Sequence, residues 1–97
     1  AWTPFGESVP QRVDRLIEEG RMGPVVLAFP DAFTSLGGNQ YVDSPVTGRW
    51  ESFIADELVP ALEPHVRLLP GPAHRAVYGK SSGGYGALLQ ALRHADR

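Results

Sequence analysis

The stretch VYGKSSGGYGAL, from Val77 to Leu88, decides how the fold and function of this chain are interpreted. A short apolar segment leads into a run of small residues, and from about Ser82 an apolar helical pattern follows. Two kinds of site are compatible with such a stretch. One is a phosphate-binding loop, in which backbone amides and a lysine hold a nucleotide. The other is a nucleophile elbow, G-x-S-x-G, which presents a reactive serine.

A phosphate-binding loop requires G-x-x-x-x-G-K-[ST], because the first glycine starts the turn whose amides surround the phosphates. Five residues before Gly79, however, the chain has His74. The intervening residues 75–78 are typical of a strand, at a place where the loop should already curve. The spacing therefore argues against a nucleotide-binding protein, which would show saturable binding of ATP with magnesium.

The elbow template fits the same residues better. It needs a strand, a sharp turn and a helix, with the serine at the turn in a strained backbone conformation. Gly79 and Gly83 stand two positions either side of Ser81 and are expected to give this turn room. The following helix would direct its free amides and partial positive charge at the reaction centre. We therefore predict Ser81 as the catalytic nucleophile and the Ser82 amide as an oxyanion-hole donor.

Helices are expected on both sides of the apolar segment Val25–Phe29. Ser8 is a good N-cap for a first helix, which Gly20 should end. A second helix is predicted from about Arg49 to Glu63, kinked or locally weakened by the internal Pro60.

The continuous apolar run Val25–Phe29 is typical of a strand buried on both faces, and RAVYG, residues 75–79, is predicted as a second strand. Residues 30–48 are rich in turn formers and are expected to be a long irregular loop. The third helix starts at about Ser82. The order helix–strand–helix–strand–helix predicts an α/β fold, with a parallel sheet and helices on both of its faces.

Composition limits the remaining possibilities. The 97 residues suit one small domain, and a 42% apolar and 21% charged composition is ordinary for a globular chain. A net charge of −2 gives no reason to expect a nucleic-acid partner, and no apolar run approaches a membrane span. The chain has no cysteine, and its three histidines have no metal-site spacing, so we expect no metal and no cofactor. These features favour the cytoplasm without fixing the compartment.

The sequence also resembles a known family. VYGKSSGGYGALLQALRHADR resembles the elbow and following helix of the esterase D and enterochelin-esterase-like branch of the α/β hydrolases. Elbows in that branch typically read Gly-His-Ser-Met-Gly-Gly-x-Gly-Ala-Leu, so Lys80 replaces the histidine and Ser82 the methionine. VVLAFPDAF, GGNQYVDSPVTGRW and WESFIADELVPALEPH resemble upstream parts of the same domain. The resemblance implies a three-layer α/β-hydrolase fold and a serine carboxylic-ester hydrolase that forms an acyl-enzyme at Ser81.

The family's catalytic triad is not complete in this sequence. An acid and then a histidine should follow the nucleophile, but only His94 and Asp96 do so. Both lie at the far end of the helix that starts at Ser81, well over ~15 Å away at ~1.5 Å per residue. The resemblance thus implies that residues 1–97 are the middle of a larger domain, without its N-terminal strands and C-terminal acid and base. We expect the isolated chain to lack efficient esterase activity.

Substrate and partners are predicted less specifically. Asp31 and Tyr41 are candidate substrate-binding residues, although Asp31 is equally well explained as a turn residue after Pro30. Trp50 is expected in the core. A small-molecule ester is the predicted substrate, with its acyl and alcohol parts left open. Exposed edges of a partial sheet favour self-association or association with the missing part of the domain. The alternative function is a non-catalytic binding module of the same fold.

Overall fold

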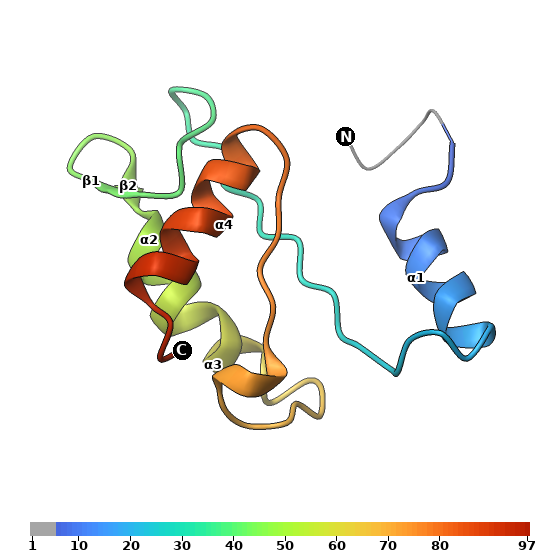
Figure 1. Cartoon of the computed structure of the whole chain (residues 1–97). Coiled ribbons are helices and arrows are strands. Elements are labelled where there is room, and N and C mark those ends of the chain that lie inside the picture. The colour runs from blue at the N-terminus through green and yellow to red at the C-terminus, as the bar shows by residue number, and fades with distance from the viewer. Residues whose placement is uncertain (1–5) are drawn as a thin grey trace.

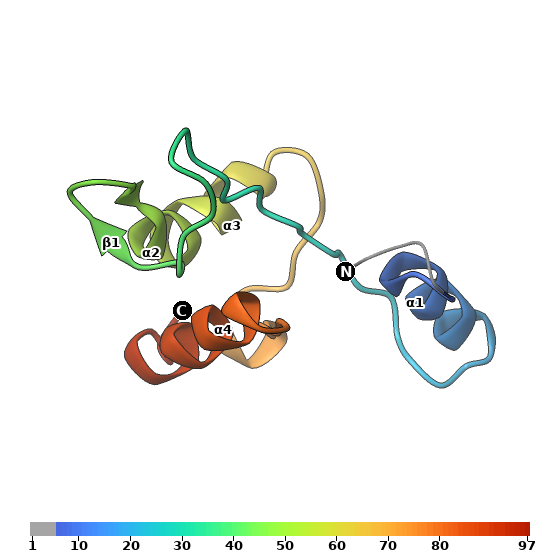
Figure 2. The same ribbon diagram turned by 90° about the horizontal axis from the view of Figure 1, so that it is seen from above.

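The computed structural model describes residues 6–97, in which one helix stands apart from a group of packed helices (Figures 1 and 2). In chain order the elements are α1 (Val9–Glu18), β1 (Asp43–Ser44), β2 (Gly48–Arg49), α2 (Trp50–Ser52), η1 (Phe53–Glu57), α3 (Leu58–Leu62), η2 (Pro72–His74) and α4 (Ser82–Arg93). An extended segment joins α1 to the rest of the molecule. The candidate site lies in the packed group, where the loop before β1 meets the start of α4.

The first helix, α1, begins where the sequence predicts it. The Gln11 N–H donates to the Ser8 hydroxyl at 3.3 Å, and the Ser8 N–H donates to the Gln11 side-chain oxygen at 2.9 Å. These reciprocal bonds satisfy two of the backbone donors that a helix start leaves unpaired. Gly20 then takes a left-handed conformation, at φ 71°, which glycine adopts at little cost. The predicted start and end of this helix are both confirmed.

The second predicted helix is confirmed as a continuous run from α2 through η1 to α3. Its middle part, η1, is a π-helical turn, which is wider than an α-helical one. Pro60 follows within α3 and has no N–H to donate to the Asp56 carbonyl, so a regular α-helical ladder cannot continue through this point. Pro60 was predicted to kink or locally weaken the helix, and the structure shows a π-helical turn just before it.

The expectation of an irregular loop over residues 30–48 is wrong at its end, where β1 and β2 form a short antiparallel hairpin. The register pairs Asp43 with Arg49 and Ser44 with Gly48. The Ser44 hydroxyl closes the turn by accepting hydrogen bonds from two backbone N–H groups inside it. Strands of two residues carry too little alternation of apolar and polar residues to be recognised in a sequence.

Polar contacts hold α4 against the start of the second helical run. The Gln90 amide, in a residue only 6% exposed, donates to the Glu51 backbone carbonyl at 3.3 Å. The Glu51 carboxylate lies 2.9 Å from the His94 Nε2 and 3.0 Å from the Arg93 guanidinium. The last turn of α4 is therefore fixed to α2 by one carboxylate that contacts two basic side chains.

The two segments predicted as strands of a parallel sheet have an irregular conformation in the described part of the chain. Within residues 6–97 the sheet is the β1–β2 hairpin, and neither Val25–Phe29 nor the segment 75–79 forms a strand. Val25, Val26 and Val77 are 45–49% exposed, so the apolar side chains of these segments are not gathered into a core. Trp50, expected in the core, is half-buried and packs edge-to-face against Phe53 at 5.9 Å. The three-layer α/β arrangement stays a prediction.

Candidate active site

Ser81 lies at a sharp bend immediately before α4. Its backbone has φ 56° and ψ −120°, a conformation that residues other than glycine rarely adopt. The bend is closed by two backbone hydrogen bonds: the Gly83 N–H donates to the Lys80 carbonyl, and the Tyr85 N–H donates to the Ser81 carbonyl, each at 3.0 Å. Ser81 is exposed. A strained, solvent-facing serine therefore stands at the N-terminal end of a 12-residue helix.

The glycines around this bend allow a close approach of the backbone to itself. A Cβ atom on Gly79 would lie 2.2 Å from the carbonyl carbon and oxygen of Gly83, and one on Gly84 would lie 3.3 Å from the Gly79 oxygen. Only glycine fits at position 79. A Cβ on Gly83 would instead enter open space. The prediction that the bend needs a residue without a side chain is thus confirmed at Gly79. Gly83 contributes the backbone atoms that Gly79 approaches.

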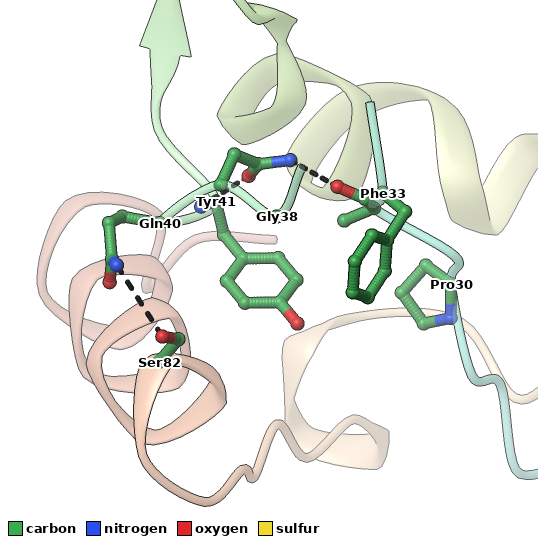
Figure 3. A pocket seen from close by; sticks show the side chains of 8 residues that line it. Pro30, Phe33, Gly38, Gln40, Tyr41 and Ser82 are labelled. Carbon is green, nitrogen blue, oxygen red and sulfur yellow. Dashed lines mark hydrogen bonds between the residues drawn. The ribbon is translucent and has the colours of Figure 1, made fainter. Parts of the chain in front are cut away.

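Ser82, the predicted oxyanion-hole residue, is the first residue of α4 and is also exposed. Its amide lies at the end of the helix that carries a partial positive charge. Its hydroxyl accepts a hydrogen bond from the Gln40 side-chain amide at 3.4 Å (Figure 3). This contact joins the loop before β1 to the residue that follows Ser81.

Tyr41 is fixed in this loop by its backbone and by its ring. With φ 60° it is, besides Ser81, the other non-glycine residue with positive φ among residues 6–97. Its N–H donates to the Asn39 side-chain oxygen at 2.6 Å, while the Asn39 amide donates to the Ala32 carbonyl. Its ring covers Gly86 on α4, where an added Cβ would come within 2.6 Å of a ring carbon. Tyr41 therefore lies on α4 one turn beyond Ser82.

A hollow of about 450 Å³ opens between this loop and the start of α4, and it is called the loop hollow below. Its lining residues are Pro30, Ala32, Phe33, Gly38, Asn39, Gln40, Tyr41 and Ser82 (Figure 3). The structure thus brings two of the predicted residues, Tyr41 and Ser82, to one cavity beside Ser81. Phe33 was not predicted, because a lone aromatic residue in a turn-rich stretch carries no periodic signal.

Asp31 does not line the loop hollow. It is exposed, and its carboxylate accepts a hydrogen bond from the Phe33 N–H at 3.0 Å. This is a local turn in which an aspartate bonds to the backbone two residues later, the alternative role considered for Asp31. The same carboxylate helps to fix the backbone position of Phe33 on the hollow.

None of the three histidines interacts with Ser81 within residues 6–97. His94 is engaged by Glu51 at the opposite end of α4, and His65 and His74 are exposed in the connector before the bend. A 12-residue helix separates its ends by roughly 18 Å at ~1.5 Å per residue. The described residues therefore place no imidazole where it could take the Ser81 proton.

Next to the site, the carboxylate of Asp43 in the β1–β2 hairpin has a lowered pKa. The Ser52 hydroxyl and N–H both donate to the Asp43 carboxylate and hold its pKa below the ordinary value. These bonds anchor β1 to α2 and so position the loop that precedes it.

Residues 6–97 contain no group of three or more acidic or histidine side chains that could hold a metal ion. In the same part of the chain, no helix has both the length and the apolar character needed to span a bilayer.

Comparison with known protein families identifies a match over most of the chain. A family model described as "Putative esterase" matches residues 8–97, which include the bend at Ser81 and the whole lining of the loop hollow. No curated protein and no solved structure matches the chain. The family match supports an esterase-type hydrolase function.

Proposed function

Since the chain belongs to the "Putative esterase" family, we propose that it is a serine carboxylic-ester hydrolase whose nucleophile is Ser81. Within that family we place it in the esterase D and enterochelin-esterase-like branch, with a three-layer α/β-hydrolase fold. The single observation that carries the proposal is the backbone of Ser81, at φ 56° and ψ −120°, directly before α4. Strain of this kind is held at functional sites by the surrounding structure.

The proposed reaction passes through an acyl-enzyme. The Ser81 Oγ attacks the ester carbonyl carbon and loses its proton to a base, the negative charge collects on the carbonyl oxygen, and the alcohol leaves with a proton. The Ser82 amide, at the N-terminus of α4, is proposed to donate to that oxygen. Water then attacks the acyl group and releases the acid. Transfer to another alcohol would follow the same chemistry.

The base and its orienting acid are proposed to come from beyond residue 97. His94 is committed to Glu51 at the far end of α4, so it is not available to Ser81. We accordingly propose that residues 1–97 form the central part of a larger domain. The 97-residue chain alone is expected to lack efficient turnover, because an unassisted serine hydroxyl is a weak nucleophile.

Hydrolysis of p-nitrophenyl acetate by the full-length protein tests this proposal. Ser81→Ala is expected to lower kcat/KM by about 10³-fold or more, since loss of the nucleophile removes the covalent route. Ser35→Ala is the matched control, because Ser35 is an exposed serine of the loop that does not line the hollow. Its kcat/KM should stay within about twofold of the parent value. Turnover that survives in Ser81→Ala would refute the assignment of Ser81.

A non-catalytic ligand-binding module is the second candidate function. The engagement of His94 by Glu51 favours it, because the described residues then supply no base. This candidate predicts that the full-length protein binds esters in the loop hollow without cleaving them. Parent and Ser81→Ala proteins would in that case show equal, background turnover.

A further inference from the structure

The loop hollow has features that restrict the group it can hold. None of its eight lining residues carries a charged side chain. The nearby Asp31 carboxylate faces its own turn and Lys80 is exposed, and neither lines the hollow. An ionised group placed there would lose water without gaining an opposite charge, which is costly. The lining therefore favours an uncharged group.

Two of the eight lining residues, Phe33 and Tyr41, are aromatic. In Figure 3 the rings of Phe33 and Tyr41 point to the same side of the loop, toward the space between the loop and the start of α4. Phe33 is 79% exposed, so a bound ring could cover apolar surface that now faces solvent. Offset or edge-on contact between aromatic rings is favourable beyond the burial of apolar area. A planar aromatic group would gain such contacts from both walls.

Contacts within the protein hold Tyr41, one of these two aromatic residues, in place. The Asn39 side chain holds the Tyr41 backbone on one side and the Ala32 carbonyl on the other, while Gly86 leaves space for the ring. A rigid wall reduces the entropy lost when a ligand binds. The volume of about 450 Å³ also falls within the range of about 300–1,000 Å³ that is usual for small-ligand pockets.

The position of the hollow links it to the proposed chemistry. Ser82 lines it, and Ser82 directly follows the strained Ser81. We propose that the loop hollow binds an uncharged aryl group of the ester substrate, with Phe33 and Tyr41 as its walls; this inference rests on the proposed function for the reaction that follows binding. An aryl group on the acyl side and one on the alcohol side offer the same ring to these walls.

Binding and turnover are measured separately to test this. Acetophenone, an uncharged aryl ketone that cannot be hydrolysed, is titrated into the full-length Ser81→Ala protein and followed by the NMR shifts of the Tyr41 and Ser82 amides. It is expected to bind at least about tenfold more tightly than 4-acetylbenzoate, because the added carboxylate finds no cationic partner in the lining. Equal affinity for the two ketones, or no shift of these amides, would overturn the inference.

Phe33→Ala tests whether the Phe33 ring contacts the bound aryl group, and Leu36→Ala is its matched control. Both side chains are exposed residues of the same loop, at 79% and 69%, but only Phe33 lines the hollow. Phe33→Ala is expected to weaken acetophenone binding about fivefold, and Leu36→Ala to leave it unchanged. An equal effect of the two changes, or no effect of either, counts against the aryl site.

Turnover measurements then show whether the aryl group belongs to the alcohol or to the acid part of the ester. They also separate the aryl-binding proposal from the proposed esterase function. The parent protein is compared on phenyl acetate, with the aryl group in the alcohol, and on ethyl benzoate, with the aryl group in the acid. A kcat/KM for either that exceeds the value for ethyl acetate, and falls in Phe33→Ala, supports the inference. If acetophenone binds but no ester is cleaved, the proposed function fails while the aryl-binding hollow stands.

Discussion

Two backbone conformations define the candidate site at the scale of single residues. Ser81 and Tyr41 both have positive φ, and they lie at the bend and in the loop that covers the start of α4. The sharp bend at Ser81 could be predicted from the sequence, because the bend requires a residue without a side chain at Gly79. The position of Tyr41 could not, because it depends on Asn39 and on contact with Gly86, which is 45 residues later.

Gly79→Ala tests the steric origin of the bend. The new methyl group would overlap the Gly83 backbone at 2.2 Å, so the segment must shift. We expect a loss of about 1–3 kcal/mol in the free energy of unfolding and loss of esterase activity in the full-length protein. Gly83→Ala is the control, since its Cβ enters open space; stability should be equal or higher by up to about 1 kcal/mol. Urea unfolding that fails to separate the two variants would contradict this origin.

The pKa of Glu7 tests the ion pairs that this residue forms with Arg15 and Arg12. Hydrogen bonds from Arg15, and then from Arg12, lower the pKa of Glu7 from 4.5 to about 2. Because the pKa is lowered on folding, the contribution of Glu7 is present above pH 4.5 and is lost as pH falls toward 2. Carbon NMR of the carboxyl group should show a midpoint near 2.

Arginine variants test which arginines lower the pKa of Glu7. Arg15→Ala should move the Glu7 midpoint back toward 4.5, and Arg12→Ala should move it less, because Arg15 is the larger cause. Arg21→Ala is the control, since Arg21 pairs with Glu19 instead. A Glu7 midpoint near 4.5 in the parent protein would contradict the described ion pairs.

At the scale of elements, helices with local signals could be predicted and contacts between elements could not. The Ser8 cap, Gly20 and Pro60 each act within one turn, so the sequence alone locates α1 and the altered winding near α3. The β1–β2 hairpin was missed because strands of two residues show too little alternation of apolar and polar residues. The attachment of α4 to α2 through Glu51 joins residues about 40 positions apart and leaves no local pattern.

Glu51→Ala tests that attachment. The Glu51 carboxylate is 12% exposed and contacts both Arg93 and His94, so its loss should lower the free energy of unfolding by about 1–3 kcal/mol. Asp56→Ala is the matched comparison, because its pair with Arg97 is about half exposed and should contribute about 0–1 kcal/mol. The difference is measured by urea unfolding of both variants. Equal effects would show that Glu51 is not the principal link between α4 and α2.

At the scale of the whole molecule, most apolar side chains remain in contact with solvent. Val26, Leu69 and Val77 are about half exposed or more, and among residues 6–97 Ala32 is the buried apolar side chain. The predicted parallel sheet would cover such side chains, since strands buried on both faces are rich in them. Local sequence predicts which segments could form strands but not which segments they would pair with, because pairing in a parallel sheet joins residues far apart in the chain. The α/β-hydrolase sheet therefore stays a prediction.

Hydrogen exchange in the full-length protein tests the sheet. If Val25–Phe29 and residues 75–79 are central strands, the amides of Val26 and Val77 should exchange at least about 10³-fold more slowly than that of Ser35 in the loop. Ser35 serves as the internal reference because it is exposed and lies outside every helix and strand. Exchange at Val26 and Val77 as fast as at Ser35 would show that these segments are not strands of a sheet.

Covalent labelling by a fluorophosphonate tests the proposed nucleophile most directly, because the reagent reacts with an activated serine hydroxyl and needs no knowledge of the natural ester. We predict that mass spectrometry of the labelled full-length protein finds one adduct, on the peptide that contains Ser81, and none in Ser81→Ala. Ser35→Ala should label as the parent does. An unlabelled parent protein, or a Ser81→Ala variant that is labelled to the same extent, would contradict the proposal that this serine is the catalytic group.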